Sequence, residues 1–314
     1  ISVKAAKVEL IGGSVDASGA EDGGSVTVAG SESVILDDSA ISVNGTAGTG
    51  GFSSITAPEV SLGSTAMVEA NGGSGGGEVL IGGGRAGRDG RVENADRVSV
   101  AAGSQISANA LNSGDGGEVI LWADGTQDFQ GSIEARGTSG GFVEVSGPES
   151  LNFAGHVDTG GGQLLLDPFN YTIGAAEAGN IVAALANNNV TIDTTMDVAA
   201  FGSSGNAADD GDITVNSNIF YDSTNDLTFL AMGDLTFNAS VQNRNDTGGD
   251  VNLVAGWDGA TASDPAAFAA EDVATTTVFG NNMGSIFVGN GAQTQAVAVG
   301  SRSGATNAFA HDVN

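Results

Sequence analysis

The sequence predicts an all-β fold, a right-handed parallel β-helix (β-solenoid) in which short strands stack coil upon coil. Glycine accounts for 51 of the 314 residues, whereas proline occurs 4 times and aromatic residues make up 5%. Hydrophobic residues still reach 40%, more than a disordered linker would contain. Pairs of glycines also recur along the chain, and an alternating apolar segment follows each pair. Short strands separated by tight turns fit all of these features.

The repeat is defined by glycine pairs ending at Gly24, Gly51, Gly77, Gly117, Gly141 and Gly162. Two residues beyond each pair stand Val26, Ser53, Val79, Val119, Val143 and Leu164, and two further on stand Val28, Ile55, Ile81, Leu121, Val145 and Leu166. Ser53 is the one residue in these positions that is not aliphatic. A spacing of two places both side chains on one face of a strand, so each glycine pair predicts the start of a half-buried strand.

Two further alternations usually follow before the next glycine pair, such as Val34/Leu36 and then Ile41/Val43. Three strands in roughly 20–27 residues make one coil of a β-solenoid. The longer interval between Gly77 and Gly116 is predicted to hold two coils. Coils stacked about 4.8 Å apart would share one aliphatic interior and complete each other's hydrogen bonds. Sandwiches and propellers are the alternative, but they usually need hairpins, longer strands and more aromatic residues.

The residue composition of the turns changes along the chain, which predicts two regions. Residues 1–168 form glycine-rich coils, and residues 169–314 continue the β-helix with Asn/Asp-rich turns and short helical or loop excursions. One helix is expected over about residues 176–187, with Ile181, Val182 and Leu185 on one face. A second is expected to begin at Asp264, a favourable N-cap that precedes Pro265.

The run Leu164-Leu165-Leu166 has no polar face, so this strand is expected to be buried on both sides. Asp167-Pro168 follows at once and should end the strand, because proline restricts the residue before it.

Charge excludes several functions. The chain has 38 Asp and Glu residues but 9 Lys and Arg residues, which gives a formal net charge of −29. Such a surface repels phosphate backbones and anionic lipids, so we expect no nucleic-acid partner and no membrane insertion. No segment approaches the roughly 18 apolar residues of a membrane-spanning helix. The chain has no cysteine, which excludes disulfides and cysteine-based metal sites.

Residues 116–173 resemble the shaft region of filamentous-haemagglutinin-like large exoproteins of the two-partner secretion pathway. The resemblance lies in residues 117–125 (GEVILWADG), 131–137 (GSIEARG), 141–147 (GFVEVSG) and 164–168 (LLLDP). It implies a right-handed parallel β-helix that is exported through an outer-membrane β-barrel partner. The amino-terminal secretion domain of such proteins carries Asn-Pro-Asn motifs, which this sequence lacks. We therefore expect the chain to lie downstream of that domain, or to belong to a relative exported differently.

The resemblance also implies a function. Such proteins are secreted, lie extracellularly or on the bacterial outer surface, and commonly serve adhesion or cell–cell contact. The expected partners are a host or neighbouring-cell surface or its glycans. The leading hypothesis is therefore a structural and adhesive shaft segment. A self-assembling subunit of an extracellular fibre or surface layer, built as a homo-filament, is the first alternative, because open solenoid ends can stack.

A polysaccharide-acting β-helix enzyme is the second alternative, and it would need a groove lined by several carboxylates and an arginine. We predict no catalytic residue and no organic cofactor. The basic cluster Arg85, Arg88, Arg91 and Arg97 is interspersed with Asp89, Glu93 and Asp96, which is typical of surface ion pairs. The candidate metal site is Ca²⁺ at Asp209, Asp210 and Asp212, the densest group of carboxylates, in an apparent turn.

The remaining motifs predict no site. His156 and His311, the two histidines, lie far apart and are expected to be solvated. Residues 82–87 match G-x-G-x-x-G but lack a surrounding βαβ unit, so they predict a turn.

Overall fold

The computed structural model describes residues 1–195, 211–257, 285–289, 297–309 and 312–313. In this part of the chain the protein is mostly β, with a single α-helix, and the strand pairs whose register is defined are parallel. The chain divides into two compact units, Ile1–Leu165 and Leu166–Asn314, and each is described by itself. The predicted all-β class with large parallel sheets is confirmed, and the arrangement is consistent with a β-solenoid.

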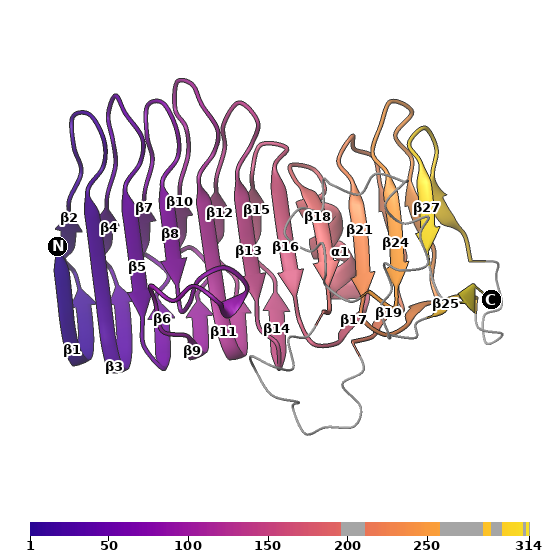
Figure 1. Cartoon of the computed structure of the whole chain (residues 1–314), viewed down its shortest axis with the longest axis horizontal. Helices are drawn as coiled ribbons and strands as arrows, with labels where there is room; N and C mark the ends of the chain where they lie inside the picture. Colours follow the sequence, from indigo (N-terminus) through magenta and orange to yellow (C-terminus); the bar gives the residue numbers. More distant parts are fainter. Residues whose placement is uncertain (196–210, 258–284, 290–296, 310–311, 314) are drawn as a thin grey trace. The chain divides into compact units, whose positions relative to one another are not determined.

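In unit 1 a strand begins directly after each glycine pair, as the repeat predicts. These strands are β3 (Ser25–Asp37), β5 (Phe52–Thr56), β8 (Glu78–Ile81), β11 (Glu118–Phe129) and β13 (Phe142–Ser146). They pair in that order to form the first sheet (Figure 1), with Val26 in register with Ser53, and Ser53 with Val79. The strand β1 (Ser2–Ile11) pairs with β3. The strand β16 (Gln163–Asp167) follows the last pair and contains the boundary between the units.

Two further rows of strands complete the coils of unit 1. The second row comprises the later halves of β3 and β11 with β6 (Glu59–Leu62), β9 (Ala95–Val100) and β14 (Ser150–Phe153). The third is a separate sheet of β2 (Ser14–Asp16), β4 (Ala40–Ser42), β7 (Met67–Glu69), β10 (Gln105–Ser107), β12 (Ser132–Glu134) and β15 (His156–Asp158). The predicted sequence of three strands per coil is therefore present.

The prediction of two coils between Gly77 and Gly116 is wrong. Val79 is in register with Val119, so β8 and β11 belong to adjacent coils. The additional residues leave the coil instead as an excursion loop, defined here as residues 82–94, which contains the 3₁₀ turn η1 (Arg85–Gly87). The loop leaves the strand at Gly82, whose φ is 74° and where a Cβ would lie 2.2 Å from a methyl group of Val98. Only glycine fits there.

The glycine pairs are needed for close contact between coils. A Cβ on Gly50 would lie 1.9 Å from the carbonyl oxygen of Ala70, and one on Gly117 would lie 2.1 Å from that of Gly77. The pairs thus allow backbone to approach backbone, which a side chain would prevent.

The interior of unit 1 is mostly aliphatic, because the inward positions that the repeat identified are fully or almost fully buried, and it also holds the stacked rings of Phe129 and Phe153. An asparagine ladder stabilises one of its turns. The backbone N–H of Asn71 donates to Oδ1 of Asn44, that of Asn109 to Oδ1 of Asn71, and that of Arg136 to Oδ1 of Asn109, each at 2.8 Å. These side chains satisfy backbone donors that would otherwise have no partner in the turn.

Unit 2 contains the helix α1 (Ala175–Ala184) and three rows of parallel strands. The first row holds β18 (Asn189–Asp193), β21 (Leu227–Ala231), β24 (Val251–Ala255) and β27 (Thr306–Phe309). The second holds β17 (Tyr171–Ile173), β19 (Ile213–Val215), β22 (Leu235–Phe237), β25 (Ser285–Val288) and β28 (Asp312–Val313). The third holds β20 (Ile219–Tyr221), β23 (Val241–Asn243) and β26 (Val299–Ser301).

The first predicted helix is present as α1, with Ile181 buried, Leu185 buried just beyond its end and Val182 half-buried. The helix predicted at Asp264 lies outside the described residues. Burial of β16 on both faces is only partly found, because Leu165 is half-buried.

Candidate functional site

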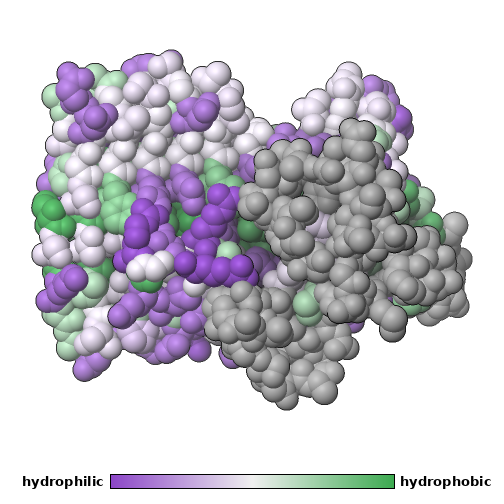
Figure 2. Space-filling view, in the orientation of Figure 1, coloured by the Kyte–Doolittle hydropathy of each residue, from purple (hydrophilic) through white to green (hydrophobic). Residues whose placement is uncertain are grey.

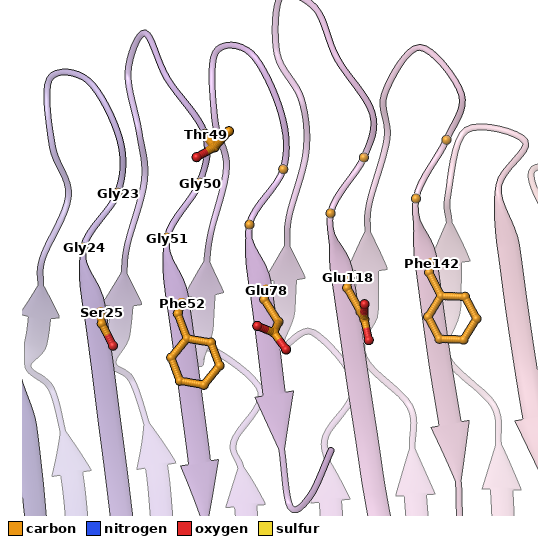
Figure 3. A pocket seen from close by; sticks show the side chains of 16 residues that line it. Gly23, Gly24, Ser25, Thr49, Gly50, Gly51, Phe52, Glu78, Glu118 and Phe142 are labelled. Atoms are coloured by element: carbon orange, nitrogen blue, oxygen red, sulfur yellow. The ribbon is translucent and has the colours of Figure 1, made fainter. Parts of the chain in front are cut away.

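A groove follows the glycine pairs across unit 1 and has a volume of about 1020 Å³. One side is formed by the outward side chains that come first after each pair, namely Ser25, Phe52, Glu78, Glu118 and Phe142 (Figure 3). Each is in register with the next, because each begins a strand of the same sheet. Since inward and outward positions alternate, the buried valines fix the direction of this outward row.

The excursion loop lies against the same face of the sheet, and partly buried hydrogen bonds anchor it. The backbone N–H of Ala86 donates to both carboxylate oxygens of Glu144, at 3.1 and 3.2 Å. Asn94 donates to Asp124 at 2.9 Å, and the indole N–H of Trp122 donates to the same carboxylate oxygen at 2.7 Å. The loop thereby has a defined position beside the groove.

Two loop arginines contact residues of the groove. Arg91 forms a two-pronged ion pair with Glu78, one contact being 2.9 Å, and its guanidinium lies 5.2 Å from the centre of the Phe52 ring. Arg85 stacks over the Phe142 ring at 4.0 Å. Cations attract the faces of aromatic rings, so each arginine restricts one ring. Figure 2 shows a hydrophilic patch where Figure 1 draws this loop, and Arg85, Arg88, Arg91 and Glu93 are all at least partly exposed there.

Glu118 is the carboxylate of the row that makes no direct ion pair with a described residue, although the charges of Arg85 and Arg91 act on it. Its side chain makes no hydrogen bond or ion pair with any residue of the described ranges. Burial raises the pKa of Glu118. The charges of Arg85 and Arg91 oppose this effect, and those of Glu78 and Asp89 add to it. The groove therefore offers, between Glu78 and Phe142, a carboxylate that has no direct partner among the described residues.

Glu144 lies on the same face but deeper, and it is fully buried. Burial raises its pKa to about 7, against hydrogen bonds from Ser146 and Ala86 and the charge of Arg85, which lower it. It anchors the loop and does not line the groove.

Neither the models of protein families nor the curated proteins give a match to this chain. None of the helices in the described ranges is long and apolar enough to span a membrane.

The predicted calcium site is only partly described, because Asp209 and Asp210 lie outside the described residues. Asp212 takes part in a ladder between strands: its backbone N–H donates to Asn170 at 2.8 Å, and its carboxylate accepts from the backbone N–H of Asp234 at 2.7 Å. Within the described ranges no three His, Cys, Asp or Glu side chains gather as metal ligands would.

The other predicted features have simple placements. The basic cluster forms surface ion pairs in part, since Arg91 bonds Asp89 as well as Glu78. Arg97 lies in β9, outside the excursion loop, and residues 82–87 begin that loop. His156 is exposed, and His311 lies outside the described residues.

Glu78, Glu118 and Glu144 were not predicted from the sequence as functional residues. A signal for the first two was present, since both occupy the position directly after a glycine pair, where Phe52 and Phe142 also stand. The residue type at that position differs from coil to coil, so the position alone does not identify a functional residue. Burial of Glu144 depends on a loop 58 residues earlier in the chain, which no local pattern predicts.

Proposed function

We propose that the chain is a shaft segment of a secreted bacterial cell-surface adhesin, built as a right-handed parallel β-helix. The observation that carries the proposal is the continuous in-register stacking of parallel strands in unit 1, from β3 to β13. Each coil shares its hydrogen bonds and its aliphatic interior with the next, which resists bending across the stack. The hand of the helix follows from the rule that crossovers between parallel strands are right-handed in about 98% of cases.

The asparagine ladder supports the mechanical role. Asn44, Asn71 and Asn109 tie turns of neighbouring coils together with side-chain bonds that are independent of the strands. A coil pulled away from its neighbour would lose both kinds of bond and would expose apolar surface. A folded shaft of this construction withstands load without disulfides, and the chain has no cysteine.

Location and partners follow from the resemblance of residues 116–173 to filamentous-haemagglutinin-like exoproteins. The protein is exported by the two-partner pathway through an outer-membrane β-barrel partner and contacts a host or neighbouring cell, or its glycans. The net charge of −29 keeps such rods dispersed and excludes nucleic acid as a partner. The protein has no enzymatic activity in this proposal.

One observation favours the polysaccharide-acting enzyme as a second candidate. The groove brings Glu78 and Glu118 into register on adjacent strands, with Arg91 bound to the first. Paired carboxylates in different environments are the arrangement that glycoside hydrolysis uses. We prefer adhesion because Arg91 already holds Glu78 in an ion pair.

Single-molecule pulling of the full chain tests the shaft. We expect the chain to lengthen in steps, one step for each coil. Negative-stain electron micrographs should show uniform short rods. A single low-force extension, or compact globules, would contradict it. Adhesion is tested separately with beads coated with the chain, which should attach to cell surfaces more than beads coated with an equally acidic, unrelated protein. Equal attachment would contradict the adhesive role but leave the shaft intact.

A further inference from the structure

We propose that the groove of unit 1 binds a linear amino-sugar polysaccharide, which lies across successive strands of the first sheet with its rings against Phe52 and Phe142. This inference rests on the proposed adhesive function and specifies the partner and the surface that would carry it.

The length of the groove favours a chain of sugars over a single one. Its row runs from Ser25 to Phe142 over five adjacent strands, β3, β5, β8, β11 and β13. Neighbouring strands lie about 4.8 Å apart, so the row extends about 19 Å. The groove is open along this length, which allows an extended polymer to enter from the side without threading.

Aromatic rings stand towards both ends of this row. Phe52 and Phe142 are three strand spacings apart, about 14 Å. Both are half-buried and line the groove, and each is contacted by a loop arginine, Arg91 or Arg85. Each arginine lies over one face of its ring and restricts it, so a ligand meets the part of the ring that the arginine leaves uncovered, without a large cost in side-chain entropy. The apolar C–H face of a sugar ring is a suitable partner for each.

The carboxylate of Glu118 calls for a ligand that donates a hydrogen bond. Glu118 has no hydrogen-bond or ion-pair partner among the described residues, and it stands between Glu78 and Phe142. Burial disfavours its charge, so an ammonium or hydroxyl group that reaches it gains a partner that is already partly desolvated. An amino sugar supplies both kinds of donor, and its positive charge complements a chain of net charge −29. Sulfated or uronic polymers would bring further anions beside Glu118, a repulsion that Arg85 and Arg91 at the side of the groove offset only in part.

A peptide strand fits less well. Added strands need an unpaired sheet edge, whereas β5, β8 and β11 are each paired on both sides. The groove presents the outward face of these strands, so recognition would fall to side chains and turn backbone, as a polymer of hydroxyl and amino groups requires.

The test is calorimetric titration of the full chain with a glucosamine hexamer, the N-acetylated hexamer, a glucosamine dimer and a sulfated hexasaccharide. We expect the glucosamine hexamer to bind most tightly, the dimer at least tenfold more weakly, and the sulfated sugar not at all. Phe52→Ala and Phe142→Ala should each weaken hexamer binding about tenfold, the loss expected when one ring is removed. Glu118→Gln, which keeps shape and removes charge, should weaken the glucosamine hexamer more than the N-acetylated one.

Glu59→Gln is the matched control, because Glu59 is exposed on β6 in the second row of strands, away from the groove, and its replacement should change nothing. Unchanged binding in Phe52→Ala, Phe142→Ala and Glu118→Gln would overturn the assignment, as would preference for the sulfated sugar. If the chain releases reducing ends from the hexamer and Glu118→Gln abolishes this release, the groove cleaves the polysaccharide, and the proposal that it only binds is wrong. If no sugar binds in the titrations but coated beads still attach to cells, the groove is not the sugar-binding surface, and the adhesive role stands.

Discussion

Replacement of Glu144 by glutamine should tighten the excursion loop at neutral and alkaline pH and leave it unchanged in acid. Glu144 is fully buried and accepts the N–H of Ala86. Its pKa rises from the ordinary 4.5 to about 7 because burial penalises the charged form. A carboxyl with a raised pKa stabilises the folded state fully below about pH 4.5, and this contribution is lost as the pH rises to about 7.

The interval between 4.5 and about 7 corresponds to about 3 kcal/mol of stability that the wild-type loop loses. The Glu144→Gln variant would keep the shape and the acceptor for Ala86 without the ionisation. We therefore expect protection of the Ala86 amide against hydrogen exchange to match wild type at pH 4. At pH 8 it should exceed wild type by up to about two orders of magnitude.

Hydrogen exchange suits this test, because the ratio between variant and wild type at one pH cancels the intrinsic rate of the amide. The control is Glu134→Gln, a partly exposed glutamate on β12 of the third sheet, whose ratio should stay near one at every pH. A constant ratio for Glu144→Gln between pH 4 and 8, or a ratio that falls with pH, would refute the assignment of Glu144 as the buried, titrating anchor.

Three further predictions concern stability, measured by urea denaturation. Asn71→Ala should cost about 1–3 kcal/mol, because the backbone N–H of Asn109 loses its partner; no loss would show that the ladder is incidental. Gly117→Ala should cost about 3 kcal/mol because its Cβ would lie 2.1 Å from a carbonyl oxygen, whereas Gly90→Ala, with open space around it, should be neutral. Ser53→Val should stabilise the chain by about 1 kcal/mol, because a buried hydroxyl without a partner is removed; destabilisation would mean that the site cannot hold the larger side chain.

The coil architecture could be predicted because its determinants are local. A glycine pair followed by apolar residues at spacing two is needed in every coil, since glycine permits the close approach of backbones and the alternation fills the interior. Even the exception, Ser53, occupies its predicted inward place between Val26 and Val79. The helix α1 was predictable for the same reason, from the spacing of Ile181 and Leu185.

The interval between Gly77 and Gly116 shows what local sequence patterns cannot predict. Its length matched two coils, but length alone does not distinguish a coil from a loop that leaves the stack at Gly82. The candidate groove was missed for a related reason. Its residues occupy outward positions such as Glu118, which the repeat leaves free, and their environment depends on Arg85 and Arg91 in a loop from another part of the chain.

The central claim is that successive coils stack in parallel register, and paired fluorescent labels test it most directly. The native chain has no cysteine, so Ser42→Cys with Glu69→Cys can carry one pyrene each without background labelling. These positions are in register on β4 and β7, about 4.8 Å apart. The account predicts strong excimer emission from this pair in the folded monomer and none from Ser42→Cys with Glu59→Cys, which lies in a different row of strands. Equal emission from both pairs, or none from the first, would contradict the stacked architecture.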